Sequence, residues 1–205
     1  MLPFNPNQTL VTGAFEGEIG ILRASGKFPH LEVMGIGNLE AAVNLSDFLF
    51  RNKKIRHIIF FGSCGAYEWT HIPIRSIVSP KLVYTKELTH ALKLSKQIPE
   101  SPESFYLVSD NDFPSVSCNA PTTISLTELK TPPEDSWVNL AVENLELFGI
   151  AKVAAKFSVS VTAYLAVTNI VGPEGSADWA KNWKDLSHSI QNQFLREMTL
   201  LPESP

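Results

Sequence analysis

Four short segments of this chain carry polar side chains at points where predicted strands end. They are GAFEGE at 13–18, GSCGA at 62–66, VENLE at 142–146 and AVTNIV at 166–171. Ligands of open α/β sheets bind beyond the carboxyl ends of strands. The pattern therefore predicts that two carboxylates, Glu18 and Glu146, converge with the glycine turn at Ser63 and the amide of Asn169 on one polar small molecule.

Each of these side chains also has an ordinary structural interpretation. Glu18 follows a strand at the start of a predicted helix, where many glutamates only face solvent. Glu146 precedes another predicted helix, where a carboxylate complements the helix dipole. Asn169 precedes Gly172-Pro173 and suits a turn. The four segments together, and no single residue, indicate a binding site.

The elements that must position these residues alternate between strands and helices. We expect strands at 8–15, 31–36, 55–61, 74–85, 105–108, 115–118, 138–142 and 162–171, and helices at 16–24, 38–52, 145–156 and 177–198, with a long loop at 119–136. The second helix is expected to begin at an Asn38 cap and to bury Leu39, Ala42, Val43 and Leu49. The alternation predicts an α/β fold, a mixed central sheet flanked by helices in three layers.

Composition narrows the class of protein. The 205 residues are 44% apolar and 19% charged, which is typical of one globular domain spanning 1–205; the proline-rich tail at 201–205 is expected to be frayed. A net charge of −4 argues against nucleic-acid binding. Lys152 and Lys156 interrupt the most apolar stretch, so no membrane span is expected. Cys64 and Cys118 make no disulfide framework, and we expect a cytoplasmic protein with both thiols buried.

Three other patterns in the sequence do not indicate a functional site. The five histidines lack metal-ligand spacing, so no metal is predicted. Gly35-Ile36-Gly37 resembles a dinucleotide fingerprint, but Glu40 stands where the third glycine belongs, and a tight strand-to-helix turn explains it better. GSCG at 62–65 is not the GxSxG elbow of a serine hydrolase.

The order and spacing of the segments resemble the purine nucleoside phosphorylase and nucleosidase superfamily. GAFEGEI is similar to the opening of the bacterial nucleosidases, GIGNLEAA to their ribose-side turn, VSCNAP to their base-side strand, ENLE to their ribose-binding acidic motif, and AVTNIVGPEGSADWAKNW to their base-recognition strand and the loop after it. The similarity runs from about Val11 to about Gln191 and is patchy between 86 and 136. Within the superfamily the pattern is most similar to the futalosine hydrolases of the alternative menaquinone route.

The resemblance implies a single-domain nucleosidase fold, no metal or organic cofactor, a small-molecule nucleoside as substrate, and a homodimer. It implies that Glu18 deprotonates a water at the anomeric carbon and that Asn169 recognises the departing base. Substrate contacts are expected from the remaining motif positions, namely Ser63, Gly65, Pro121, Thr122, Asn144, Leu145, Glu146 and Thr168.

A methylthioadenosine/S-adenosylhomocysteine nucleosidase is one alternative function, and two further alternatives stay open. GSCGA is also similar to the hexameric purine nucleoside phosphorylases, but Phe60 stands where that family has an arginine, and a phosphate dianion needs such cations. A non-catalytic nucleoside-binding protein is the other alternative, because Leu165 replaces an arginine that the relatives carry and the 110–135 segment is poorly matched.

The identity of residue 169, an asparagine, indicates which purine base the site prefers. Adenine-specific nucleosidases carry aspartate there, which suits the 6-amino donor and the N7 acceptor of adenine. A 6-oxopurine presents acceptors at both O6 and N7, and an asparagine NH₂ can donate to them. We therefore expect hypoxanthine-type nucleosides, futalosine above all, to be preferred over methylthioadenosine.

Overall fold

The structure is a computed structural model that describes residues 4–96, 98 and 104–199; the tail at 201–205 lies outside the described residues. Its strands are β1 Thr9–Gly13, β2 Leu31–Val33, β3 His57–Ala66, β4 Ile77–Tyr84, β5 Ser104–Tyr106, β6 Ser115–Asn119, β7 Val142–Glu143 and β8 Ser160–Ile170. Its α-helices are α1 Gly20–Ala24, α2 Asn38–Arg51, α3 Leu88–Ala91, α4 Leu147–Phe157 and α5 Gly175–Thr199.

The strands form one mixed sheet that closes on itself in part. Strands β2, β1, β3 and β8 lie side by side in this order and run parallel to one another, whereas β7 is antiparallel to β3 and β4 is antiparallel to β8. Beyond them, β3 pairs with β7, β7 with β6, β6 with β4, and β4 with β8, which pairs back to β3. These five strands therefore make a closed ring of pairings, and the carboxyl end of β3 lies where β8 and β7 both meet it.

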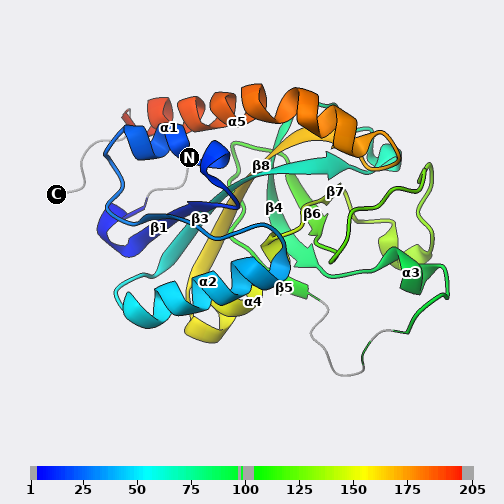
Figure 1. Cartoon of the computed structure of the whole chain (residues 1–205), viewed down its shortest axis with the longest axis horizontal. Coiled ribbons are helices and arrows are strands. Elements are labelled where there is room, and N and C mark those ends of the chain that lie inside the picture. Colours follow the sequence, from blue (N-terminus) through cyan, green and yellow to red (C-terminus); the bar gives the residue numbers. More distant parts are fainter. Residues whose placement is uncertain (1–3, 97, 99–103, 200–205) are drawn as a thin grey trace.

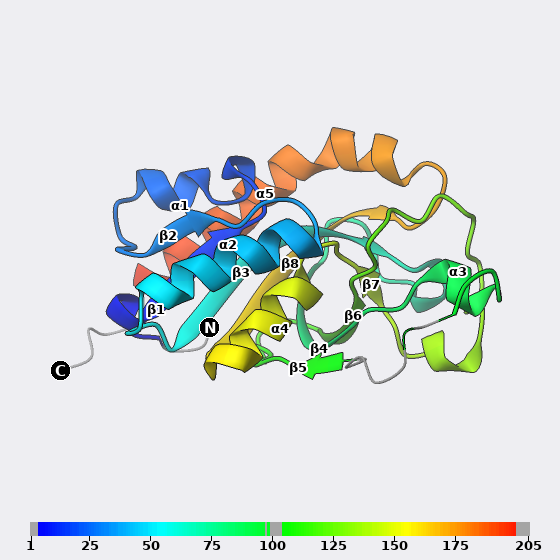
Figure 2. The same cartoon turned by 60° about the horizontal axis from the view of Figure 1, so that its bottom comes forward.

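Helices cover the sheet on both faces. Helices α1 and α5 lie on one side, and α2 and α4 lie on the other (Figures 1 and 2). The long strand β8 is apolar and rich in β-branched residues, and eight of its eleven positions, Val161 to Thr168, are buried, as expected for a strand with both faces covered. The predicted fold class, a mixed sheet flanked by helices, is confirmed.

The predicted buried face of α2 is confirmed at Leu49 and wrong at Leu39 and Val43, while Ala42 is half-buried. Leu39 and Val43 are 76% and 57% exposed, whereas Ala41, Leu45 and Leu49 are buried against α4 and the sheet. Apolar residues occur on more than one side of this helix, so the sequence allowed two faces at the same spacing.

The predicted Asn38 cap is also wrong. Gly37 is the N-cap residue of α2, and the Asn38 side chain instead accepts from the backbone N–H of Gly149 at 2.8 Å and donates to the carbonyl of Ala120 at 2.9 Å. Asn38 therefore ties the start of α2 to α4 and to the segment that follows β6.

The strand expected at 138–142 is reduced to Val142–Glu143. The residues before it turn through a short 3₁₀ segment, Asp135–Trp137, which buries Trp137 against Tyr67 and Leu140. The long loop expected at 119–136 is present. Among the described residues, no helix combines the length and the apolar character that crossing a membrane requires.

Candidate active site

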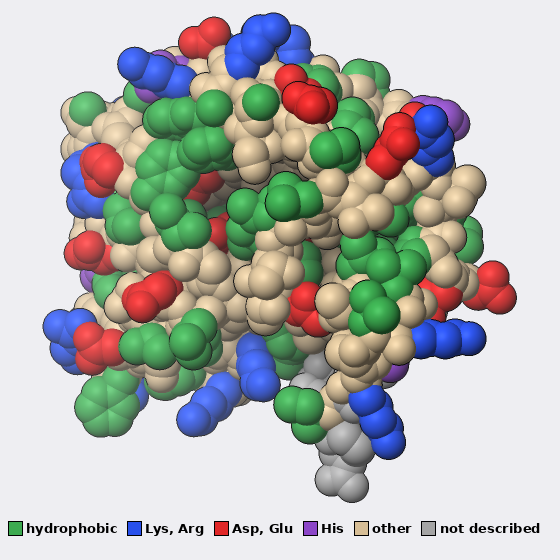
Figure 3. Space-filling model, turned by 45° about the vertical axis from the view of Figure 1, so that its right-hand side comes forward, with side chains coloured by type: hydrophobic (Ala, Val, Ile, Leu, Met, Phe, Trp, Pro, Cys, Tyr) green, Lys and Arg blue, Asp and Glu red, His purple; other side chains and the backbone are tan. Residues whose placement is uncertain are grey.

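A cavity of about 400 Å³ opens at the carboxyl ends of β1, β3, β7 and β8. This volume lies in the range of small-molecule sites. Figure 3 shows its mouth as a hollow ringed by hydrophobic side chains, with acidic side chains partly visible inside. Each of the four segments singled out in the sequence contributes to the wall, through Glu18, Ser63, Glu146 and Asn169 among others.

Glu18 lies on the cavity wall in the short 3₁₀ turn Glu16–Glu18 that follows β1. Its side chain is 4% exposed. Oε2 accepts from the backbone N–H of Ala14 at 2.8 Å, and Oε1 accepts from the backbone N–H and the hydroxyl of Ser63 at 3.1 and 3.3 Å. Burial, followed by the nearby charge of Glu146, raises the pKa of Glu18 to about 8 despite these three donors. The carboxyl can therefore exchange a proton near neutral pH.

Glu146 faces the same cavity from the turn between β7 and α4. Oε1 accepts from the backbone N–H of Gly37 at 2.9 Å, and Oε2 accepts from the Asn144 amide at 2.9 Å. Gly37 presents its N–H from a backbone with φ of +87°, a conformation that favours glycine. Burial raises the pKa of Glu146 above its ordinary value. These contacts fix a carboxylate that can accept from vicinal hydroxyl groups.

Asn144 holds the turn that carries Glu146. Its Oδ1 accepts from the backbone N–H groups of Glu146 and Leu147, which begins α4, at 3.1 and 2.9 Å. Its Nδ2 donates to the Ser63 carbonyl at 3.0 Å. Asn144 therefore connects the end of β3 to the acidic turn and so links two sides of the cavity.

Asn169 lies on the cavity wall near the end of β8, and its amide is oriented by the protein. Oδ1 accepts from the Thr168 hydroxyl at 2.8 Å, and Nδ2 donates to the Ile170 carbonyl at 3.0 Å. One N–H of this amide remains after these contacts. A Cβ at Gly65 would lie 2.8 Å from Asn169 Nδ2, so the glycine provides the room in which the amide sits.

Three of the sequence-predicted substrate contacts lie off the cavity wall. Thr168 is fully buried and supports Asn169. Thr122 is exposed, and its N–H and hydroxyl both donate to the Glu87 carboxylate at 2.8 Å. Pro121 lies on the same segment, and its carbonyl accepts from Asn38 at 3.3 Å. The structure does bring together Glu18, Ser63, Gly65, Asn144, Leu145, Glu146 and Asn169.

Sequence reasoning assigned no role to a third wall carboxyl, Glu143. It is 8% exposed, and Oε2 accepts from the hydroxyls of Tyr67 and Ser125, both at 3.0 Å. Burial raises the pKa of Glu143. The Ser125 contact ties the long loop to β7. A buried glutamate in a two-residue strand gives no sequence signal beyond its place in VENLE.

The mouth of the cavity is apolar, and most of it was also missed. Phe15, Ile36, Ile124 and Trp179 line it, and they come from four different parts of the chain. Ile36 and Ile124 are 66% and 55% exposed. An apolar entrance over a polar floor suits a ligand with a polar sugar and a planar or apolar group.

Within the described ranges, no three His, Cys, Asp or Glu side chains are grouped so as to hold a metal ion. Cys64 and Cys118 are free and buried, as predicted. Burial raises the pKa of both thiols well above the ordinary range, which leaves them protonated and weakly nucleophilic.

No model of a known protein family matches the sequence, and no curated protein sequence matches it. Solved structures do. A 5′-methylthioadenosine/S-adenosylhomocysteine nucleosidase mutant from Helicobacter pylori, with 5′-methylthioadenosine in its active site, superposes with a TM-score of 0.74 at 13% identity, over 94% of this chain and 97% of that one. The futalosine hydrolase of the same organism gives a TM-score of 0.74 at 13% identity, over 93% and 96%. The chain has the nucleosidase fold.

A third structure, the corresponding nucleosidase of Streptococcus pneumoniae in complex with 8-aminoadenine, matches equally well, with a TM-score of 0.74 at 15% identity over 92% of this chain and 96% of that one. The resemblance seen in the sequence motifs is thus confirmed for the fold. The likeness covers nearly the whole length of both kinds of nucleosidase.

Proposed function

We propose that this protein is a nucleosidase that hydrolyses the N-glycosidic bond of a purine nucleoside. The observation that carries the proposal is the pairing of Glu18 and Glu146 in one buried cavity, in a chain with the nucleosidase fold. Cleavage of this bond passes through a cationic, oxocarbenium-like sugar. A site with two carboxyls, one able to take a proton and one able to hold hydroxyls, matches that chemistry.

In the proposed reaction, Glu18 removes a proton from the water that attacks the anomeric carbon, while Glu146 accepts from the ribose hydroxyls. Such a general base contributes a factor of about 10²–10⁴ in rate. The Ser63 hydroxyl and N–H hold the Glu18 carboxyl in place. Negative charge at either carboxylate also stabilises the positive charge that develops on the sugar.

Water is a better nucleophile for this cavity than phosphate. In the described part of the chain, the carboxyl side chains on the cavity wall are Glu18, Glu143 and Glu146, and the wall carries no Lys, Arg or His side chain. A phosphate dianion brought among three carboxyls would be repelled and would lose its hydration. This supports a hydrolase over a phosphorylase.

The base-side contact supports a 6-oxopurine, and hence futalosine as the first substrate to test. Thr168 and Ile170 leave Asn169 with one N–H to offer, so the amide can donate to one acceptor of the base and not to both O6 and N7. N7 occurs in both classes of purine, so the proposed preference depends on donation to O6, an acceptor that only a 6-oxopurine carries. The products would be hypoxanthine and the dehypoxanthinyl sugar.

Methylthioadenosine is the second candidate substrate. The apolar mouth formed by Ile36, Ile124 and Trp179 suits a small thioether on the 5′ carbon. A neighbour in the structural comparison also holds 5′-methylthioadenosine in its active site.

The function is tested by incubating the purified protein with futalosine, inosine and methylthioadenosine and measuring the free base by chromatography. Release of hypoxanthine faster than adenine supports both the activity and the base preference. Faster release of adenine from methylthioadenosine would retain the nucleosidase activity and reject the assignment of Asn169. Binding of a nucleoside with no release of base would favour the non-catalytic alternative.

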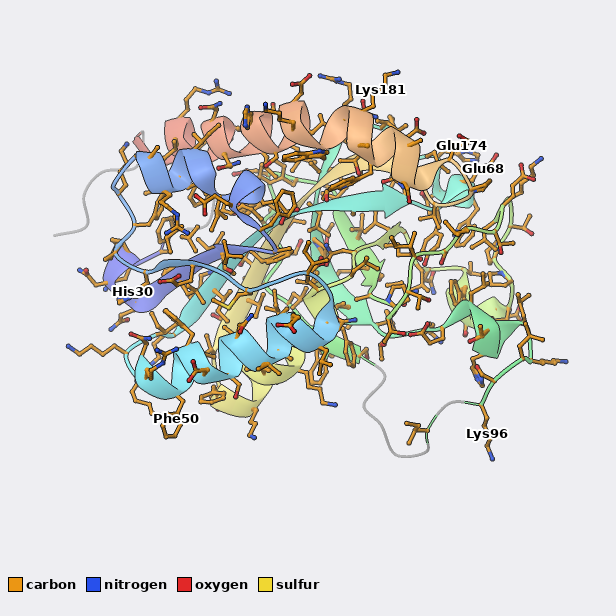
Figure 4. The ribbon with its side chains drawn as sticks, viewed as in Figure 1. His30, Phe50, Glu68, Lys96, Glu174 and Lys181 are labelled. Atoms are coloured by element: carbon orange, nitrogen blue, oxygen red, sulfur yellow. The ribbon has the colours of Figure 1, made fainter. Side chains whose placement is uncertain are left out.

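We further propose that the protein works as a homodimer. Leu39, Val43 and Phe50 on α2 are between 57% and 76% exposed, and Figure 4 shows Phe50 pointing outward at the edge of the molecule. This apolar stripe begins three residues after Ile36 of the cavity mouth, so a second copy packed on α2 would border the site. Gel filtration should return about twice the 22.7 kDa monomer mass; a 22.7 kDa species would contradict the dimer.

A further inference from the structure

Trp179 lies on the inward face of α5, at the cavity. It lines the cavity wall, whereas Lys181, two residues later, points outward from the helix (Figure 4). Its indole stacks on Trp183 with ring centroids 5.7 Å apart and meets the edge of Phe15 at 6.4 Å. These contacts hold the indole plane and fix where its N–H points.

That N–H donates to the Ser63 hydroxyl at 3.0 Å. An indole nitrogen only donates, so this bond occupies a lone pair of Ser63 Oγ and leaves the single hydroxyl hydrogen for another acceptor. Glu18 Oε1 lies 3.3 Å from Oγ and accepts it. The three groups thus form a directed chain from Trp179 through Ser63 to Glu18.

We propose that Trp179 is a positioning residue that, through its indole N–H, directs the Ser63 hydroxyl toward the Glu18 carboxylate. Ionised Glu18 then keeps three donors, two backbone N–H groups and one hydroxyl. Without the indole N–H, the hydroxyl is free to turn away or to accept from a protonated Glu18. The effect of this arrangement on turnover rests on the proposed function, whereas the hydrogen bonds from Trp179 through Ser63 to Glu18 do not.

Loss of the indole N–H and loss of the indole bulk should shift the pKa of Glu18 in opposite directions. A donor fixed on the ionised carboxyl lowers the pKa, so loss of the indole N–H raises it. Loss of indole bulk admits water and therefore lowers the pKa of a carboxyl that burial now raises. The other ionisable group that acts on Glu18 is Glu146, across the cavity, and it is unchanged in either case.

A double-mutant cycle on the ligand-free protein separates the effect of the hydrogen bonds from Trp179 through Ser63 to Glu18 from the effect of lost packing on the Glu18 pKa. The pKa of Glu18 is measured by ¹³C NMR titration of its side-chain carboxyl in the wild type, Trp179→Phe, Ser63→Ala and the double variant. We expect Trp179→Phe to shift this pKa upward by about 0.5 or more relative to the shift that it causes in the Ser63→Ala background. Equal shifts in the two backgrounds would overturn the proposal.

Two further proteins make the result secure. Trp183→Phe keeps the indole N–H of Trp179 and keeps an aromatic ring against that indole, so it should shift the Glu18 pKa much less than Trp179→Phe does; a shift as large as that of Trp179→Phe would overturn the proposal. Replacement of Trp179 by 3-benzothienylalanine keeps the bicyclic shape and lacks the N–H, so it tests the same bond if Trp179→Phe does not fold. It should raise the Glu18 pKa, and an unchanged value would overturn the proposal.

Turnover gives an independent readout. If the protein hydrolyses nucleosides, the acid limb of kcat/KM should move with the Glu18 pKa in each variant, with KM changed less than kcat. An unmoved limb would overturn the proposal while leaving the nucleosidase activity standing. If no nucleoside is hydrolysed, the proposed function fails, and the NMR cycle still decides whether Trp179 acts through Ser63.

Discussion

Glu18 and Glu146 face one cavity whose described lining includes no Lys, Arg or His side chain, and they are only 4% and 6% exposed. Each is held by backbone N–H groups, from Ala14 and Ser63 on one side and from Gly37 on the other. The Glu146 charge contributes to the raised pKa of Glu18. Two like charges kept together in a buried site are costly, which indicates that the cavity is built to meet a cationic partner such as the sugar of the transition state.

Replacement of Glu18 by Gln should abolish turnover while leaving nucleoside binding largely intact. The amide cannot take the proton of water, so kcat should fall by a factor of about 10² or more. Binding is measured by calorimetry and kcat by base release. Glu16→Gln is the matched control, because Glu16 is exposed and pairs with Arg23; a fully active Glu18→Gln variant would remove Glu18 from the mechanism.

The rate should rise with pH through about 8. Glu18 acts as a base only when ionised, and its pKa in the free protein is about 8, so kcat/KM should increase on the acid side and level off above this value. The profile is measured with inosine between pH 6 and 9.5. A rate that falls over this interval would assign Glu18 the role of an acid instead.

The contribution of Glu18 to the stability of the fold should fall as pH rises from about 4.5 to 8. In this interval the folded state holds a proton on Glu18 that the unfolded chain releases, because the pKa is raised on folding. Urea unfolding at pH 5.5 and 8 should therefore show a smaller loss of unfolding free energy for Glu18→Gln than for the wild type. Glu143 and Glu146, whose pKa values are also raised, add to the loss in both proteins, and His57, whose pKa burial lowers to about 4, opposes it below about pH 6.5 in both. Equal losses in the two proteins would contradict the burial of an ionisable Glu18.

Gly65→Ala should disable recognition of the base. The added Cβ would lie 2.8 Å from Asn169 Nδ2 and 2.9 Å from Val171 Cγ2, so the amide must move. We expect a higher KM and a weaker preference between 6-oxo and 6-amino purines. Gly20→Ala on α1 is the control, since a Cβ there meets only the Glu16 side chain at ordinary contact distance. Unchanged kinetics in Gly65→Ala would remove Asn169 from the base contact.

Asn169→Asp should shift the preference toward 6-amino purines. An aspartate has no N–H for the Ile170 carbonyl, and its charge beside that carbonyl favours protonation. When substrate binds, its single O–H can donate to N7 while its other oxygen accepts from a 6-amino group. A mismatched buried polar pair costs about 1–3 kcal/mol, so the ratio of adenine to hypoxanthine release should rise by up to roughly a hundredfold. An unaltered ratio would refute the assignment.

The parts of the fold that the sequence predicts are those with a strong local pattern. The bounds of β8 and α4 were predicted to within two residues, although β3 continues five residues past its expected end at 61, through GSCGA to Ala66. The buried face of α2 was predicted only in part, because Leu39 and Val43 repeat with the same period as Ala41 and Leu45. The closed ring of strands depends on β4 pairing with β8, a long-range contact that no local pattern contains.

The site likewise contains residues that local motifs predict and contacts that depend on long-range packing. Short motifs at strand ends contain Glu18, Ser63, Glu146 and Asn169, so the sequence could predict that these side chains lie close together. The contact of Trp179 with Ser63 joins residues 116 positions apart, and the tie between Ser125 and Glu143 depends on the path of a loop. Such contacts follow from packing, so only the structure shows them.

The most direct test of the account is the rate of hypoxanthine release from futalosine and inosine in phosphate-free buffer, with the wild type and Glu18→Gln measured side by side. The account predicts release by the wild type without phosphate, the free sugar as the second product, and a loss of at least about a hundredfold in the variant. Release that requires phosphate and yields a sugar 1-phosphate would identify a phosphorylase. No release from any purine nucleoside would contradict the account.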